Sequence, residues 1–208
     1  MSACRVRRDR ILDLQSDKRK AQGVFTISDA ILPMLFNLRH TGEIQCVDMD
    51  RAMCQSIDSH RPRYNKPEGN FPGLLIRPAM HMDVNDAITV LCFNGEERLF
   101  GLWDFDLTET IGKLMKLLKP SLQTLADCRV KGRIVITGSV RTDGFRSYEE
   151  RECFMRSVLP RGMEFVKCEP YSSNYYTRNR EYKRRAPMAQ YIIQGKPTTA
   201  ARTFARAA

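Results

Sequence analysis

The dipeptide Asn94-Gly95 is the local signal that most constrains the fold of this chain. It follows the apolar run 87–93, AITVLCF, and precedes the run 96–103, EERLFGLW. Asn-Gly between two apolar runs is typical of a two-residue β-hairpin turn, because both residues tolerate positive φ. The pattern therefore predicts two antiparallel strands here and favours a sheet built from hairpins.

The remaining elements are predicted from periodicity and from terminal signals. Asp106 begins an amphipathic pattern with Glu109 as its capping-box partner, and Pro120 is expected to stop that helix. Strands are expected at 25–38, 71–78, 130–141, 163–168 and 187–193, and helices at 47–57, 106–118 and 145–160. The order strand, helix, strands, helix occurs once in full and then begins again.

Composition limits the functional class. The chain has 208 residues and a net charge of +10, from 34 Lys+Arg against 24 Asp+Glu, which attracts polyanions without identifying them. No apolar run approaches the roughly 18–20 residues that span a bilayer, and no apolar segment follows the basic start MSACRVRRDR. We therefore expect an intracellular protein without a membrane partner.

The sequence shows no catalytic or metal-binding pattern. His40, His60 and His81 are isolated, and the acidic residues within 149–152 are typical of an exposed helix face. Seven scattered cysteines without a C-x-x-C pair argue against a disulfide framework and against a zinc module. We therefore expect a protein that is not an enzyme and has no catalytic residues, metal site, cofactor or small-molecule substrate.

An ordered set of motifs occupies residues 61–118. A Tyr-Asn-x-Pro loop leads into Phe-Pro-Gly-Leu, a second apolar run ends before the Asn-Gly turn, and a third run containing glycine leads into the amphipathic helix. The residues concerned are Tyr64, Asn65, Pro67, Phe71, Pro72, Gly73, Leu74, Leu91, Cys92, Phe93, Gly95, Gly101 and Asp106. This order resembles the repeat unit of the TATA-box-binding protein family, and the later half resembles a divergent second repeat like those encoded by large DNA viruses.

The resemblance implies an α+β fold, namely the saddle of that family. Its curved antiparallel sheet carries helices on the convex face, and its second repeat is degenerate or truncated. The resemblance divides the chain into a basic arm at 1–23, a first repeat at 24–120, an incomplete second repeat at 121–196 and a tail at 197–208.

The function implied is that of a transcription factor for transcription initiation, which binds AT-rich duplex DNA through the minor groove and bends it. Phe71 and Phe93 align with the wedge pair that enters base steps in this family. The expected DNA-binding residues are Phe71, Phe93, Ile31, Arg98, Phe100 and Leu91. General transcription factors or an RNA polymerase are the expected partners, in the nucleus or at a viral replication site.

Two other functions remain open. Asp29 and Glu96 replace an asparagine and a lysine of the family, which favours a saddle that recruits transcription machinery without binding DNA itself. The tyrosines and arginines of 171–185 favour a basic RNA-binding protein, since such side chains stack on bases, although no RNP-type motif accompanies them.

Overall fold

The computed structural model describes residues 23–27, 42–65, 74–141, 143–176 and 183–196, with side chains described throughout except at 108 and 170–187. The elements in chain order are β1 (Gly23–Ile27), β2 (Gly42–Asp48), α3 (Arg51–Tyr64), β3 (Leu74–Ile76), β4 (Met80–His81), α4 (Val84–Phe93), the 3-10 helix η1 (Glu97–Leu99), β5 (Phe100–Thr110), α5 (Ile111–Asp127), β6 (Arg133–Ser139), α6 (Tyr148–Val158), β7 (Met163–Tyr176) and β8 (Lys183–Gly195).

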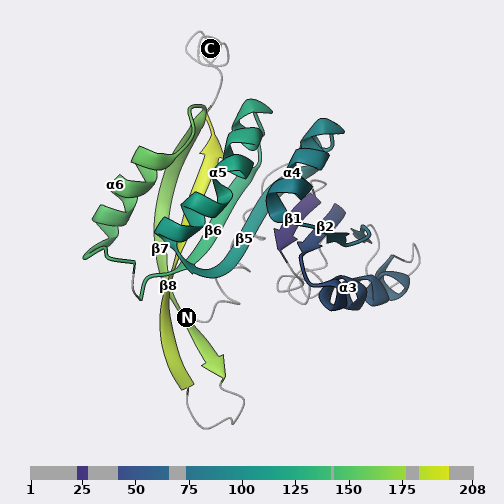
Figure 1. Ribbon diagram of the computed structural model, residues 1–208, viewed down its shortest axis with the longest axis horizontal. Coiled ribbons are helices and arrows are strands. Elements are labelled where there is room, and N and C mark those ends of the chain that lie inside the picture. Colours follow the sequence, from purple (N-terminus) through teal and green to yellow (C-terminus); the bar gives the residue numbers. More distant parts are fainter. Residues whose placement is uncertain (1–22, 28–41, 66–73, 142, 177–182, 197–208) are drawn as a thin grey trace, which may run out of the picture.

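These strands form one sheet in the order β3-β2-β1-β5-β6-β8-β7, with the short β4 paired to β2 (Figure 1). The pairs among β3, β2, β1, β5 and β6 are all parallel, and β8 is antiparallel to both β6 and β7. The predicted antiparallel saddle is therefore wrong, and the chain has a mixed, mostly parallel α/β sheet. Strands from before and after residue 120 belong to the same sheet. The predicted division of the chain at residues 23, 120 and 196 stays a prediction.

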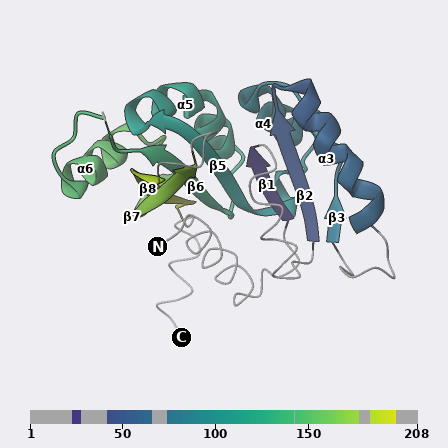
Figure 2. The ribbon, with the colours of Figure 1, turned by 90° about the horizontal axis from the view of Figure 1, so that it is seen from below.

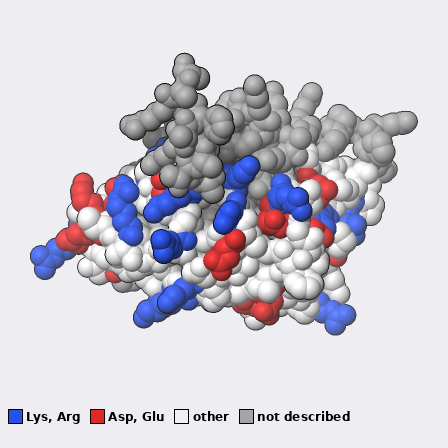
Figure 3. All heavy atoms as spheres, turned by 90° about the horizontal axis from the view of Figure 1, so that it is seen from above, with Lys and Arg blue, Asp and Glu red and all other residues white. Residues whose placement is uncertain are grey.

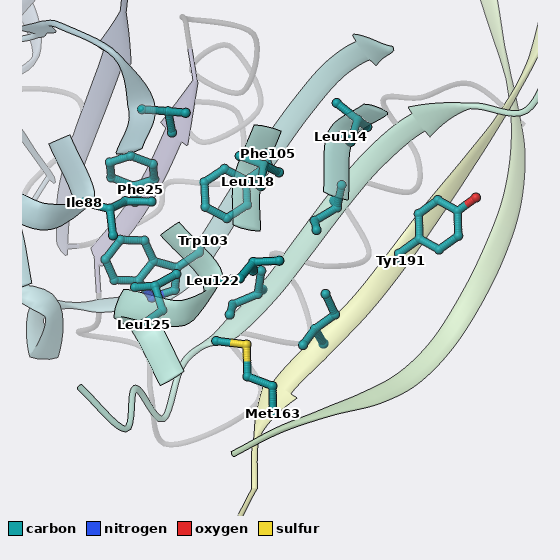
Figure 4. Packing of buried hydrophobic residues seen from close by; sticks show 14 of the residues in the cluster. Phe25, Ile88, Trp103, Phe105, Leu114, Leu118, Leu122, Leu125, Met163 and Tyr191 are labelled. Carbon is teal, nitrogen blue, oxygen red and sulfur yellow. The ribbon is translucent and has the colours of Figure 1, made fainter. Parts of the chain in front are cut away.

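Helices cover both faces of the sheet, which explains why its strands are apolar on both sides. On one face α4, α5 and α6 bury a large cluster against Phe25, Trp103 and Phe105, which Figure 4 shows from close by. On the other face α3 packs Ile57 against a smaller cluster that includes Ile44. No helix among the described residues is long and apolar enough to cross a membrane.

The hairpin predicted around Asn94-Gly95 is wrong, because residues 84–93 form a helix. Asp83 caps its start, its side chain accepting from Asn85 N at 2.8 Å, and its buried residues recur at helical spacing. Gly95, with φ of 70°, ends it: Gly95 N donates to Cys92 O and Glu96 N to Leu91 O. This pair of bonds is the Schellman motif, so the Asn-Gly signal marks the end of a helix.

Pro120 lies inside α5, although the sequence predicted that it would stop the helix. A proline cannot donate, and its ring disrupts the local ladder of hydrogen bonds. The side chain of Asn85 from α4 bridges this position. Its Nδ2 donates to Leu117 O at 3.2 Å, while its Oδ1 accepts from Ser121 N at 3.2 Å and from Ser121 Oγ at 2.6 Å. These bonds supply partners that the interrupted ladder lacks, and they fasten α4 to α5.

The C-terminal third agrees better with the sequence. The strand expected at 130–141 is β6, and the helix expected at 145–160 is α6. Earlier in the chain, the helix expected at 47–57 overlaps α3, which begins and ends later. The strands β7 and β8 are longer than predicted. The last β6–β8 pair joins Ser139 to Met188, so residues 183–187 of β8 pair only with β7, as a ribbon that projects beyond the end of β6 (Figure 1).

Two phenylalanines distinguish this fold from the predicted saddle. Phe25 is fully buried against Phe100 and Trp103, whereas Phe93 is 90% exposed at the end of α4. Phe25→Ala should lower the free energy of unfolding by roughly 3–5 kcal/mol, because it leaves a cavity in the core. The same change at Phe93 should cost less than about 0.5 kcal/mol. Urea unfolding of both variants measures the difference, and similar losses would contradict this arrangement of the two rings.

Candidate functional site

The order of the strands creates one edge at which side chains from several strands can meet. The chain passes from β1 outward to β2 and β3, and then returns to place β5 on the opposite side of β1. The connections that leave the carboxyl ends of β1 and β5 therefore diverge, and ligands of open α/β sheets bind at such a switch point. Figure 2 shows β1, β2 and β3 side by side, with their arrowheads pointing in the same direction, towards this edge.

Asp48 is the last residue of β2 and is half-buried at this edge. Its Oδ1 accepts from Asp50 N at 2.8 Å, and its backbone O accepts from Met82 N at 3.2 Å, so the carboxylate is fixed by the turn into α3. No hydrogen bond to its Oδ2 is found among the described residues. The carboxylate is therefore positioned, with one oxygen able to accept hydrogen bonds from a ligand.

Met49 follows Asp48 and is 70% exposed. The ring of His81, from β4, donates through Nε2 to Met49 O at 3.0 Å and so holds the backbone at this position. An exposed apolar side chain beside a fixed carboxylate is the combination that binds a ligand with both an apolar and a hydroxyl-bearing part.

A row of polar residues lies on the strands next to the switch point. Thr26 of β1 is in register with Asp104 of β5, and Asp106 of β5 is in register with Thr137 of β6. Thr26, Asp104 and Thr137 are fully buried, and Asp106 is partly exposed. Thr137 Oγ1 accepts a hydrogen bond from Gln190 Nε2 at 3.3 Å, and Thr26 Oγ1 donates to Ile27 O at 3.3 Å. The row is the second component of the candidate site because it lies beside the switch point.

The loop after β6 reaches the same edge and is fixed by a buried ion pair. Arg151 of α6 donates from Nε to Asp143 Oδ2 at 2.6 Å and from its terminal nitrogen to Oδ1 at 2.9 Å. The guanidinium also donates to Ser147 O at 2.9 Å and Phe145 O at 3.1 Å, and it lies over the Tyr148 ring at 5.2 Å. The hydrogen bond to Asp143 raises the pKa of Arg151, which stays protonated. The pair thus closes residues 143–147 into a rigid loop.

Two further polar side chains lie near this pair. Burial raises the pKa of the Cys168 thiol to about 12, and burial also raises the pKa of the Tyr191 hydroxyl. Both groups stay protonated and neutral near pH 7, so they are poor candidates for a nucleophile or a base. No group of His, Cys, Asp or Glu that could hold a metal ion occurs in the described part of the chain.

Four of the residues expected to bind DNA are described, and they lie in different environments. Leu91 and Phe100 are 2% exposed and belong to the core, whereas Phe93 and Arg98 are exposed at the end of α4 and in η1. Phe71 and Ile31 lie outside the described residues, as does Asp29.

The sequence did contain a signal for Asp48, which falls within the helix expected at 47–57. The segment 42–48, GEIQCVD, is a short run that ends in an acidic residue, Asp48. This residue lies about 20 residues beyond the end of β1. That spacing is the one at which dinucleotide-binding folds place a ribose-binding carboxylate. The accompanying glycine-rich turn is missing, since no glycine occurs between Gly23 and Gly42.

Comparison with known proteins identifies the fold but no family. No protein-family model and no curated protein matches the chain. Among solved structures, it is similar to a SAM-dependent methyltransferase from Agrobacterium tumefaciens, with a TM-score of 0.56 and 10% identity over 91% of this chain and 61% of that one. It is also similar to a putative RNA methyltransferase from Pyrococcus horikoshii, with a TM-score of 0.52 and 9% identity over 93% and 85% of the two chains.

A third solved structure contains a ligand. It is the N-methyltransferase NodS from Bradyrhizobium japonicum in complex with S-adenosyl-l-homocysteine, with a TM-score of 0.51 and 12% identity over 94% of this chain and 89% of that one. At such identities the likeness shows the Rossmann-like fold that these methyltransferases share. This chain spans only 61% of the length of the Agrobacterium protein.

The functional predictions drawn from the sequence are corrected accordingly. The resemblance to the TATA-box-binding family is contradicted, and with it the DNA-binding transcription factor, the interaction module and the RNA-binding protein. The expectation of AT-rich DNA and transcription machinery as partners is contradicted too. So are the expectations that the protein is not an enzyme and that it has no small-molecule substrate. The physical reason is the sheet, whose parallel strands provide a ligand edge rather than a concave antiparallel face.

The ion pair that fixes the loop after β6 can be tested directly. Asp143→Ala leaves the buried guanidinium of Arg151 without its counter-charge and should lower the free energy of unfolding by roughly 3–5 kcal/mol. Glu109→Ala is the matched control, since it breaks the exposed pair with Lys113 and should change stability little. Denaturant unfolding compares the two, and equal effects would show that Asp143 does not stabilise the loop.

Proposed function

We propose that this chain binds S-adenosylmethionine at the carboxyl edge of its parallel strands and transfers the methyl group to an acceptor. The observation that carries the proposal is the position of Asp48. It ends β2, beside the switch point between β1 and β5, in a fold that resembles methyltransferases.

Asp48 and Met49 fit the adenosine half of the cofactor. A ribose carries two neighbouring hydroxyls that donate hydrogen bonds, and the Asp48 carboxylate accepts them with one oxygen already fixed by Asp50 N. Met49 offers exposed apolar surface to the flat face of the adenine. Both residues are held from outside the loop, by Met82 N and by His81, so little ordering is needed on binding.

We assign no described residue to the binding of the methionine half of the cofactor. The connection that follows β1 lies outside the described residues, and it contains no glycine. Glycines at that position in dinucleotide-binding folds let the backbone approach a pyrophosphate. S-adenosylmethionine carries no pyrophosphate, so the absence of these glycines is compatible with the proposal.

When bound, the cofactor supplies a methyl group whose carbon is electrophilic, because it is attached to a positively charged sulfur. The chain must orient the acceptor and take up its proton. Asp106 is a partly exposed carboxylate of β5, in register with Thr137 of β6, and it is the residue we propose to accept a hydrogen bond from the acceptor. The fixed loop at 143–147 provides a rigid wall after β6.

The proposal predicts a specific effect of Asp48→Asn on cofactor binding. Isothermal titration should show that the wild-type chain binds S-adenosylhomocysteine, and that the variant binds it about tenfold or more weakly, because a charged hydrogen bond to ribose becomes a neutral one. Asparagine keeps an oxygen for Asp50 N, so the local fold should be retained.

Asp127→Asn is the matched control for this experiment. Asp127 is exposed at the end of α5, at the opposite edge of the sheet, so the same change of charge there should leave the affinity unaltered. Wild-type protein that binds neither S-adenosylmethionine nor S-adenosylhomocysteine at millimolar concentration would overturn the proposed function. Equal affinity of wild type and Asp48→Asn would overturn the role of Asp48.

A further inference from the structure

Two neighbouring helices bring a pair of cysteines together. Both α4 and α5 follow parallel strands on the same face, so both run from the carboxyl edge to the amino edge of the sheet (Figure 1). They end on the face seen from above in Figure 3, where basic and acidic side chains are interspersed. Helices that run side by side in one direction keep their relative register along their length.

The Asn85–Ser121 hydrogen bonds set that register. Seven residues make about two helical turns and return a side chain to the same side of its helix. Seven residues beyond Asn85 lies Cys92, and seven residues beyond Ser121 lies Cys128. The contact at the start of α4 therefore predicts a second contact, between Cys92 and Cys128, near the ends of the helices.

The structure contains this second contact. The Cys92 thiol lies beside the Cys128 thiol, which adds to the rise in the pKa of Cys92. Both cysteines are free, both are partly exposed, and both pack against the same hydrophobic cluster. Among the other described cysteines, Cys46 and Cys54 are buried, Cys153 is exposed on α6, and Cys168 is partly exposed on β7.

We propose that Cys92 and Cys128 form a disulfide when the protein meets a peroxide, and that this bond joins the ends of α4 and α5. The proposal is independent of the proposed function. A disulfide requires the two cysteines to lie close together in the folded chain, and the register of α4 and α5 brings Cys92 and Cys128 side by side near the ends of these helices.

The chemistry proceeds in two balanced steps. Burial raises the pKa of Cys92 to about 12, and the neighbouring thiol makes a smaller contribution to this rise. Cys92 is therefore rarely a thiolate near pH 7. We assign the first attack to Cys128. Its thiolate attacks one oxygen of hydrogen peroxide, the O–O bond breaks, and the products are a sulfenic acid and hydroxide, which takes up a proton. Cys92 then loses its proton and attacks the Cys128 sulfur. The S–O bond breaks, and a second water leaves with that proton.

The disulfide should stabilise the fold, because it closes the chain from Cys92 to Cys128 and restricts the unfolded state. For a chain of this length, we expect the oxidised form to melt roughly 5–12 °C above the reduced form. Reduction with a dithiol should return the melting temperature to its starting value.

The test uses the full chain, treated with hydrogen peroxide and then digested without reduction. Mass spectrometry should find the peptides that contain Cys92 and Cys128 linked, with a loss of two hydrogens, and the melting temperature should rise. Cys92→Ser and Cys128→Ser should each abolish the linked peptides and the rise. Cys153→Ser, the matched control at an exposed cysteine, should keep both.

Three results would overturn the proposal. One is the oxidation of Cys153 without any linkage between Cys92 and Cys128. Another is a linkage that forms equally when the protein is unfolded in denaturant, since it would then owe nothing to the packing of α4 on α5. The third is a linked protein that melts no higher than the reduced one. The serine variants serve as tests if their reduced forms melt within about 3 °C of the reduced wild type, a shift that corresponds to about 1 kcal/mol.

Discussion

Parallel pairing of β5 between β1 and β6 is the constraint from which the rest of this structure follows. Two parallel strands cannot be joined by a tight turn, because the chain must return to the opposite edge before the next strand begins. The described returns through α3, α4 and α5 are helices that pack on the sheet, so both faces are covered and the strands are apolar on both sides. The same geometry brings every parallel strand to its carboxyl end at one edge, where Asp48 and Asp106 lie.

The covering helices must fit one another as well as the sheet, and Asn85 makes this possible. A proline in the middle of α5 would normally interrupt the helix. Asn85 supplies a donor and an acceptor at that point from the adjacent helix, so the interruption becomes a junction between α4 and α5. One side chain thus keeps α5 continuous over its buried leucines and fixes the register that brings Cys92 to Cys128.

The antiparallel strand β8 completes the sheet between β6 and β7, and the loop after β6 leaves the carboxyl end of that strand. Gly138 in β6 passes so close to α5 that an added Cβ would lie 2.9 Å from Leu114 Cδ1 and 3.1 Å from Glu109 O. Beyond it, Asp143 and Arg151 fix the loop through a buried pair, and Arg151 makes two further hydrogen bonds to backbone oxygens of the loop. The edge that holds the polar row is therefore bounded by rigid segments on β2 and β6.

The sequence by itself determined the local elements whose signals are self-contained. The strand near 133–139 and the helix near 148–158 could be predicted, because a buried apolar run and a Ser-capped amphipathic pattern need no distant partner. The amphipathic pattern after β5 was recognised too, although its start and end were misplaced. For the candidate site, the sequence contained Asp48 and its spacing from β1, but a single carboxylate does not reveal which edge it faces.

Only the tertiary structure decided how two ambiguous signals were resolved. Asn94-Gly95 can turn a hairpin or end a helix, and the packing of Val84, Ala87 and Leu91 against the sheet selected the helix. Pro120 can stop a helix, and Asn85, which is distant in the sequence, allowed α5 to continue. Both choices depend on contacts between residues far apart in the chain. Local patterns carry no information about such contacts, so the same signals are compatible with an antiparallel saddle and with the parallel sheet that this chain forms.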